Sequence, residues 1–257
     1  MDAQAIIDLE HDHVLGVYGR APFVLERGQG STLYDSDGRA YIDCVAGIAV
    51  NALGYGDPGI EHAMLEGMAR GMLHVSNLYH TAPHAQLAQF LCATSFADRV
   101  HFCNSGAEAN EGAFKFARLA TGRTNFVAFN KGFHARTMGA LSVTWEPNYR
   151  KPFLPLLEAT HTPYNNRARL DAAVDDQTAA VVIEIVQGEG GVNIGEPDFL
   201  LAAQRICRER GALLLVDEIQ TGFGRTGRLF ALEHVGLEPD LLVLAKGVGA
   251  GFPMGAV

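Results

Sequence analysis

Two charged residues, Asp217 and Lys246, each follow a run of apolar residues. The first run begins at Ala212 and the second covers residues 241–245. Apolar runs without polar alternation are typical of strands that are covered on both faces in a parallel sheet. Ligands of such sheets bind beyond the carboxyl ends of the strands, so we expect both charges to face a binding site. For either residue alone, a solvated charge at a strand end explains the pattern equally well.

A carboxylate and an amine at neighbouring strand ends fit the chemistry of pyridoxal phosphate. Apolar surroundings lower the pKa of a lysine, so the neutral amine of Lys246 can condense with the aldehyde of this cofactor as a Schiff base. Asp217 can keep the pyridine nitrogen protonated, and the ring then withdraws electrons from the substrate. The pair therefore predicts that the chain also contains a phosphate site.

Residues 99–118 contain a candidate for that phosphate site. A short apolar stretch at 100–103 predicts a strand, Asn104-Ser105-Gly106 predicts a turn, and a helix is expected from Ala107. The first N–H groups of a helix and the positive end of its dipole favour a bound phosphate. We therefore predict Ser105, Gly106 and Ala107 as cofactor contacts. Glycine turns also precede helices in proteins without ligands, so the prediction depends on the other two features.

Five motifs stand out along the chain: NSGAEANE (104–111), GFHART (132–137), IVQGEGGV (185–192), LLLVDEIQTGFGRTG (213–227) and LAKGVGAGFPMGA (244–256). Together they resemble the class III, ornithine-aminotransferase-like, pyridoxal-phosphate-dependent aminotransferases of fold type I. With SNLYHT at 76–81, the set looks most like acetylornithine aminotransferases, and it covers nearly the whole chain. In this family the sequence continues well beyond the equivalent of Val257, so the resemblance predicts a C-terminally truncated chain or fragment.

The resemblance implies roles for five more residues. Phe133 would stack on the cofactor ring, His134 would belong to the cofactor site, and Gln220 would bond the ring hydroxyl. Arg136 would bind a substrate carboxylate, and Glu189 would neutralise an arginine that the family carries in its C-terminal domain. Without the resemblance, Phe133 reads as an aromatic core residue and Glu189 as a solvated loop carboxylate.

Two positions depart from the family pattern. Ala135 stands where the family usually has glycine, which affects the local backbone and the direction of Arg136. Ile185 replaces a proline that is common in its motif. Glu218, beside Asp217, is expected to be structural.

The implied reaction is transfer of the terminal amine of acetylornithine, or of a similar ω-amino compound, to 2-oxoglutarate. The products are a semialdehyde and glutamate, as in arginine biosynthesis, with Lys246 as the general base and acid. Ornithine, succinylornithine and 4-aminobutyrate aminotransferases share these motifs and remain alternatives. An aminomutase, a lysine-dependent aldolase and an inactive fragment that only binds cofactor or a partner also remain. The family implies a homodimer.

Composition narrows the class of protein. The chain has 257 residues, of which 48% are hydrophobic, enough for a large core. A net charge of −9 argues against nucleic-acid binding. The N-terminus lacks a signal-peptide pattern, and no apolar run approaches the roughly 20 residues of a membrane span. Four irregularly spaced cysteines suggest reduced thiols, and no ligand cluster predicts a metal site, so we expect a cytoplasmic protein.

The chain is expected to have an N-terminal small subdomain at 1–50 and a pyridoxal-phosphate-binding large domain at 51–257, incomplete at its C-terminus. The subdomain should contain a helix at 2–18 and a β-meander at 23–43. The large domain should be of the α/β class, a mostly parallel sheet with helices on both faces. Its expected helices are 59–70, 83–96, 107–120, 171–175 and 198–210, its further strands are 125–129, 140–144 and 180–185, and 145–169 should be a long surface loop.

Overall fold

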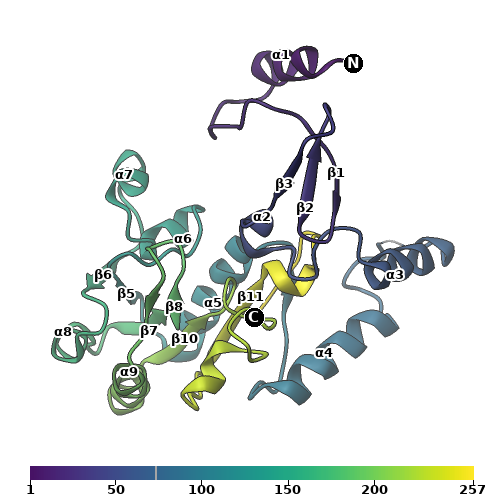
Figure 1. The fold of residues 1–257 in the computed structure, drawn as a ribbon. Coiled ribbons are helices and arrows are strands. Elements are labelled where there is room, and N and C mark those ends of the chain that lie inside the picture. The colour runs from purple at the N-terminus through teal and green to yellow at the C-terminus, as the bar shows by residue number, and fades with distance from the viewer. Residues whose placement is uncertain (73) are drawn as a thin grey trace. The chain divides into compact units, whose positions relative to one another are not determined.

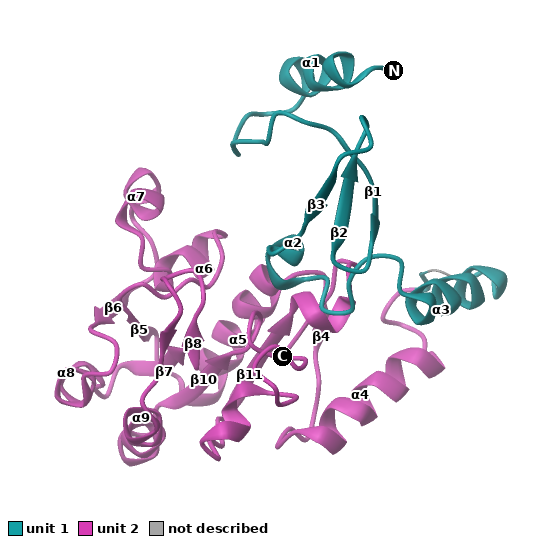
Figure 2. Ribbon diagram, in the orientation of Figure 1, with its two compact units in different colours: residues 1–75 teal, residues 76–257 magenta. Residues whose placement is uncertain are grey.

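The computed structural model describes residues 1–72 and 74–257. They belong to two compact units, residues 1–75 and 76–257 (Figure 2). This boundary lies later in the chain than the expected one after residue 50. A backbone bridge accounts for the first part of the difference, because Gly30 N–H donates to Tyr55 O (2.8 Å) and Tyr55 N–H donates to Gly30 O (2.9 Å). The bridge ties the segment after residue 50 to the N-terminal meander.

The first unit contains the predicted meander, three antiparallel strands in the order β1-β2-β3. Helix α1 (Ala3–His13) starts at the Asp2 cap but ends earlier than expected, since Val14 is extended and glycines follow at 16 and 19. The remaining elements are β1 (Leu25–Gln29), β2 (Thr32–Asp35), β3 (Ala40–Ile42), α2 (Ala46–Ala49) and α3 (Pro58–Ala69).

The second unit is built on a seven-stranded sheet in the order β4-β12-β11-β10-β7-β5-β6. The neighbours from β11 to β6 run parallel, whereas β12 is antiparallel to both β11 and β4. A mostly parallel α/β sheet is therefore confirmed. The strands are β4 (Phe102–Cys103), β5 (Asn125–Phe129), β6 (Ala159–Thr162), β7 (Thr178–Ile183), β10 (Leu213–Asp217), β11 (Leu241–Ala245) and β12 (Gly255–Ala256).

Helices cover both faces of this sheet, as predicted (Figure 1). Alternate strand residues enter two separate core clusters, in keeping with the two-residue period of a strand. On β7, Val181 and Ile183 pack in one cluster with residues of α9 (Pro197–Arg210), while Ala180 and Val182 pack in the other with residues of α5 (Gly106–Thr121). The other helices are α4 (Ala82–Thr94), α6 (Met138–Val143), α7 (Pro147–Arg150) and α8 (Arg167–Ala173).

Two sequence predictions in this unit are wrong. Residues 140–144 do not form a strand, because they belong mainly to α6, whose residues 139–143 are all buried. A short buried apolar run has no periodicity that separates helix from strand. Residues 145–169 are not one loop, because they include α7, the 3₁₀ turn Lys151–Phe153 and β6. β6 tolerates polar residues since it lies at the edge of the sheet.

Candidate active site

Three functional groups lie at the carboxyl ends of neighbouring strands. Asp217 is the last residue of β10, Lys246 directly follows β11, and Glu184 directly follows β7. Leu215 and Val182 belong to the core cluster on the α5 side, so Asp217 and Glu184, two residues farther along each strand, face α5 as well. Lys246 interacts electrostatically with both carboxyl groups. Asp217 and Lys246 therefore lie at the carboxyl ends of neighbouring parallel strands, as predicted.

Lys246 differs from a solvated lysine in its pKa and in its backbone conformation. Burial lowers its pKa, and the opposing charges of Asp217, Glu189 and Glu184 offset only part of that effect. Its backbone has a φ of +49°, a left-handed conformation that side chains other than glycine adopt at a cost. The strained backbone and the lowered pKa both set this residue apart from an ordinary solvated lysine.

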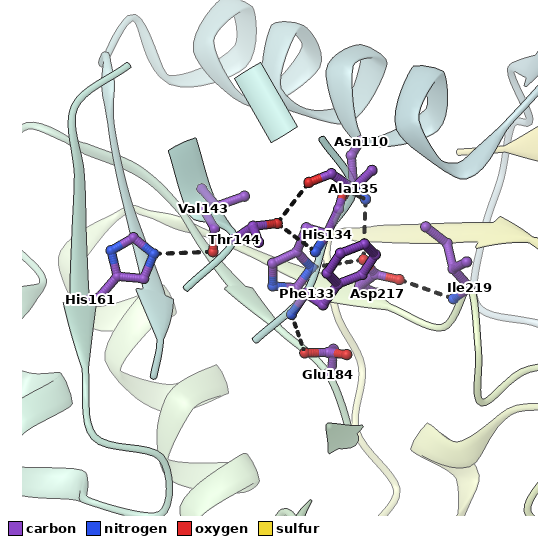
Figure 3. Close-up of polar contacts among 10 residues, drawn as sticks. All are labelled: Asn110, Phe133, His134, Ala135, Val143, Thr144, His161, Glu184, Asp217 and Ile219. Atoms are coloured by element: carbon purple, nitrogen blue, oxygen red, sulfur yellow. Dashed lines mark hydrogen bonds and ion pairs between the residues drawn. The ribbon is translucent and has the colours of Figure 1, made fainter. Parts of the chain in front are cut away.

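The Asp217 carboxylate is held by three hydrogen bonds (Figure 3). Its Oδ2 lies 2.7 Å from His134 Nδ1 and accepts from Asn110 Nδ2 at 3.1 Å. Its Oδ1 accepts from Ile219 N–H at 3.0 Å. Each carboxylate oxygen can accept two hydrogen bonds. Among the contacts within 1–72 and 74–257, Oδ1 therefore retains one acceptor direction for a ligand.

His134 is the residue whose ring is in hydrogen-bond contact with this carboxylate. Its side chain is 1% exposed. Burial lowers the pKa of the imidazole, but the hydrogen bond and charge of Asp217 outweigh burial and leave the pKa raised. His134 N–H donates to Thr144 Oγ1 at 2.9 Å, which fixes the backbone as well. His134 therefore reaches the predicted cofactor site through Asp217.

Glu184 was not among the predicted site residues, yet it lies at the end of β7 and interacts electrostatically with Lys246. Burial raises the pKa of its carboxyl to about 8, although the charge of His134 acts in the opposite direction. Its Oε2 accepts from Phe133 N–H at 3.1 Å. The rule that located Asp217, a charge at the end of a buried strand, also applies to Glu184.

The segment from Phe133 to Arg136 adds an aromatic ring and a cation. Phe133 is half-buried, and Arg136 is exposed with its Cζ 6.0 Å from the centre of the Tyr149 ring. Ala135, the residue that replaces the usual glycine, has a φ of +96°, in the half of conformational space that favours glycine. Thr144 Oγ1 donates to Ala135 O at 2.9 Å and helps to hold this backbone.

The predicted strand, turn and helix at the candidate phosphate site are present, and the phosphate contact itself stays a prediction. β4 leads into α5, and Ser105 caps the helix by accepting from Glu108 N–H at 3.2 Å. Gly106 is in close contact with Ile219, since a Cβ there would lie 2.6 Å from Ile219 Cδ1. Ala107 lies in the first turn, where helix N–H groups have no partner within the helix.

Gln220 and Glu189 lie in different parts of the fold, Gln220 in the turn after β10 and Glu189 between β8 (Val186–Gln187) and β9 (Asn193–Ile194). The Gln220 side chain occupies the space that a Cβ on Gly188 would need. Glu189 is exposed in the turn of the hairpin formed by β8 and β9. Gln187 Nε2 donates to Asn130 O at 2.9 Å and attaches this hairpin to the end of β5.

Glu218 is structural, as predicted. It is fully buried, and its carboxylate accepts from the N–H groups of Ala231 and Leu232, both at 2.7 Å, and from Thr221 Oγ1 at 3.1 Å. These bonds cap the short 3₁₀ helix Ala231–His234. Asp217 and Glu218 are adjacent acids with different surroundings, because successive strand residues point to opposite faces.

The residues at the carboxyl ends of β10 and β11 and at the start of α5 fit pyridoxal phosphate. A carboxylate with a remaining acceptor position, an amine with a lowered pKa and a helix N-terminus match its ring nitrogen, aldehyde and phosphate. Within 1–72 and 74–257, no group of three or more His, Cys, Asp or Glu side chains is arranged to hold a metal ion. No helix in that part of the chain has the length and apolar character needed to cross a membrane.

Two curated relatives show how far the sequence is shared. The chain is 48% identical over 255 residues to the acetylornithine aminotransferase of Methanosarcina acetivorans, covering 98% of this chain and 64% of that protein. It is 50% identical over 252 residues to the acetylornithine aminotransferase of Gloeobacter violaceus, covering 95% of this chain and 63% of the relative. The chain therefore spans less than two thirds of the length of these relatives.

Solved structures agree with the sequence comparison. The ornithine aminotransferase of Toxoplasma gondii, whose structure reveals partial occupancy of PLP at its active site, aligns with a TM-score of 0.93 at 31% identity over 98% of this chain and 62% of its own. The N-acetylornithine aminotransferase of Stenotrophomonas maltophilia aligns with a TM-score of 0.80 at 38% identity, over 97% and 64% respectively. The family model for class-III aminotransferases matches residues 17–257. The chain belongs to the class-III aminotransferase family.

Proposed function

We propose that the chain carries the pyridoxal-phosphate-binding part of an aminotransferase that moves the terminal amine of acetylornithine to 2-oxoglutarate. The products are a semialdehyde and glutamate, and the reaction belongs to arginine biosynthesis. One observation carries the proposal: Lys246, with a lowered pKa, lies in electrostatic reach of Asp217 at the next strand end. The acetylornithine aminotransferases at 48% and 50% identity support the choice of amino donor.

The residues proposed to hold the cofactor lie at the carboxyl ends of the central strands, in the segment after β5 and at the start of α5. Lys246 would bind the aldehyde carbon, Asp217 would pair with the ring nitrogen, and Ser105, Gly106 and Ala107 would contact the phosphate. Phe133 would cover the ring, and Gln220 would bond the ring hydroxyl. This assignment is supported by the acceptor direction left on Oδ1, by the half-buried Phe133 and by the helix N-terminus. When bound, pyridoxal phosphate supplies an aldehyde for amines and an electron-withdrawing ring.

Each residue then has one task in the transfer. Lys246 Nζ takes the proton from the substrate carbon that bears the amine and later returns a proton, which requires a neutral amine near neutral pH. Its lowered pKa supports this task. Asp217 keeps the ring nitrogen protonated, and the hydrogen bond with His134 stabilises the charged form of Asp217. Arg136 binds a substrate carboxylate, in the manner typical of guanidinium groups.

Glu189 is proposed to govern the exchange between the two substrates. Its carboxylate is exposed in the β8–β9 turn yet interacts with the charge of Lys246. A carboxylate in this place can pair with a cation when the monocarboxylate donor binds and release it for the second carboxylate of 2-oxoglutarate. The pairing partner in the family is an arginine beyond the region shared with this chain.

The proposed setting is a homodimer in the cytoplasm. Exposed apolar side chains in the second unit, Val192, Ile194 and Phe252, support a contact with another chain. Four free thiols support a reducing compartment. Sedimentation of the purified chain tests the dimer.

The decisive experiment is an absorption titration of the purified chain with pyridoxal phosphate, followed by borohydride and peptide mass spectrometry. We expect a covalent link on Lys246 and a spectral change on addition of acetylornithine. Ornithine, succinylornithine and 4-aminobutyrate serve as competing donors. A larger change with one of these would replace the proposed donor, and no link on Lys246 would overturn the proposal.

A further inference from the structure

Two adjacent residues of α5, Asn110 and Glu111, hold opposite ends of the segment from His134 to Ala140. Asn110 Nδ2 donates to His134 O at 3.0 Å. Glu111 Oε1 accepts from Gly139 N–H at 2.8 Å and from Ala140 N–H at 3.2 Å. Both belong to the motif at 104–111, yet neither is among the predicted site residues. Consecutive helix residues point about 100° apart, so one turn of helix can serve two places.

Asn110 connects this segment to Asp217. Besides His134 O, its Nδ2 donates to Asp217 Oδ2 at 3.1 Å (Figure 3). Both partners of Nδ2 are acceptors, so the orientation of the amide follows from its surroundings. Asn110 is fully buried, and its Oδ1 has no hydrogen-bond partner among the residues that the structure describes. The amide therefore serves two buried acceptors and leaves its own oxygen unsatisfied, which indicates that the position is adapted to His134 and Asp217.

Asn110 also limits how Asp217 can turn. Oδ2 already accepts from Asn110 and lies in hydrogen-bond contact with His134 Nδ1, while Oδ1 accepts only from Ile219 N–H among the contacts of the described residues. Loss of the Asn110 bond would leave the carboxylate held by His134 and Ile219 alone, so it could rotate more easily about its last bond. The acceptor direction proposed for the cofactor nitrogen would then be less well defined.

Glu111 acts at the other end, next to Arg136. It caps the first turn of α6, which begins two residues after Arg136. The fit is tight, because a Cβ on Gly139 would overlap the Glu111 carboxylate. The start of α6 and the chain that leads to it are therefore fixed by a side chain from α5. Residues 133–138 have few regular backbone bonds of their own, so this support matters for their direction.

We propose that Asn110 and Glu111 are positioning residues with separate tasks, Asn110 orienting Asp217 and Glu111 orienting the Arg136 segment. One turn of α5 thereby links the cofactor end of the site to its carboxylate end. The inference rests on the proposed function for the identity of the ligands. Its structural part is independent of any ligand.

Amide hydrogen exchange on the cofactor-free chain tests the structural part. In Glu111→Ala, exchange at Gly139 and Ala140 should accelerate about tenfold, and Glu111→Gln, which keeps an acceptor oxygen, should restore part of the protection. In Asn110→Ala, the His134 carbonyl loses its donor, so the His134 N–H bond to Thr144 Oγ1 should open more often and exchange at His134 should accelerate. Lys115→Ala, an exposed change on the same helix, is the matched control and should leave exchange at His134, Gly139 and Ala140 unchanged. Unchanged exchange in both alanine variants would overturn the proposal.

Binding and kinetics test the separation of tasks. Asn110→Ala should weaken pyridoxal phosphate binding and lower kcat, each about tenfold, with little change in the Michaelis constant for the oxo-acid substrate. Glu111→Ala should raise that Michaelis constant about tenfold and leave cofactor affinity within about twofold. If both variants changed the same parameter equally, the separate tasks would be refuted. If the wild-type chain bound no cofactor, the proposed function would fail, and the exchange experiment alone would decide the positioning roles.

Discussion

The strand ends and the segment from Gly132 to Ala140 both contribute to the site, but different forces place them. Asp217 and Lys246 are positioned by the register of β10 against β11, where Asp217 pairs with Val243. The segment is positioned by side chains from α5, from the end of β7 and from Thr144. Substitutions at the strand ends should therefore change the chemistry of the site and leave its geometry intact. Substitutions of the residues that hold the segment should instead alter its backbone path, and change the chemistry only through the orientation of the reactive groups.

Lys246→Ala should give the largest effect and define the strand-end class. Transamination should fall by at least about 10³-fold and the covalent link to the cofactor should disappear, because the variant lacks the amine. Thermal stability should be kept, since the side chain is desolvated and its placement depends on backbone pairing. The measurements are single-turnover absorbance and thermal unfolding, with Lys115→Ala as the exposed control. A variant that kept a tenth of the wild-type rate would contradict the assignment.

Glu184→Gln should reveal a pH dependence that joins the two regions, because Glu184 ends β7 and also accepts from Phe133 N–H. Burial raises the pKa of this carboxyl from 4.5 to about 8 in the folded chain. The stability that it contributes is complete below pH 4.5 and is lost as the pH rises through 8, since the unfolded chain releases the proton first. The free energy of unfolding of Glu184→Gln relative to wild type should therefore increase over this window by on the order of a few kcal/mol.

Urea unfolding at several pH values between 4.5 and 8.5 measures this difference. Glutamine keeps an acceptor for Phe133 N–H, so the comparison isolates the ionisation. Glu158→Gln, a change at an exposed glutamate, should show no such slope. A wild-type minus variant difference that stayed flat across the window would mean that Glu184 is solvated in the folded chain.

Gly188→Ala should act on Gln220 with a smaller effect. The added Cβ would overlap the Gln220 side chain, whose flexible end can move away at little cost to stability. We expect about tenfold weaker pyridoxal phosphate binding and a change in unfolding free energy below about 1 kcal/mol. In a Gln220→Ala background the same substitution should cause no further loss of affinity, as a fluorescence titration would show. Gly112→Ala is the control, because a Cβ there makes only ordinary contacts.

The sequence predicted the strand-end residues because period and polarity act locally. An uninterrupted apolar run that ends in a charge identified β10 and β11, and parallel pairing then brought Asp217 and Lys246 to one edge. The same rule, applied to β7, would have found Glu184. Asn110 also left a signal, since it shares a helical stripe with the buried Ala113 and Ala117 and is the polar member of that stripe.

The supports of the 132–140 segment could not be predicted in the same way. Thr144 and Glu111 act through side-chain bonds to backbone groups that lie far away in sequence, and such pairs have no periodic signature. For the same reason residues 140–144 were predicted as a strand. The Glu111 bonds to Gly139 and Ala140 stabilise the first turn of a helix that the apolar pattern alone does not distinguish from a strand.

Ala135→Gly should give the smallest effect and the sharpest test of how the segment is held. Alanine at φ +96° is strained, and glycine removes that strain while adding flexibility to the unfolded chain. The net result should be about 1 kcal/mol of added stability in urea unfolding. Ala120→Gly, in the exposed last turn of α5, should instead lose up to about 1 kcal/mol.

Cofactor affinity then separates two explanations of what determines the backbone path of the segment. If the bonds from Asn110, Thr144 and Glu111 determine the path of the segment, Ala135→Gly should bind pyridoxal phosphate within about twofold of wild type. If alanine itself enforces the conformation, the glycine variant should bind the cofactor more weakly, and its gain in stability should vanish because the segment would no longer have one preferred path. A loss of stability equal to that of Ala120→Gly would show that Ala135 carries no strain. The conformation at residue 135 would then be one that alanine adopts without cost.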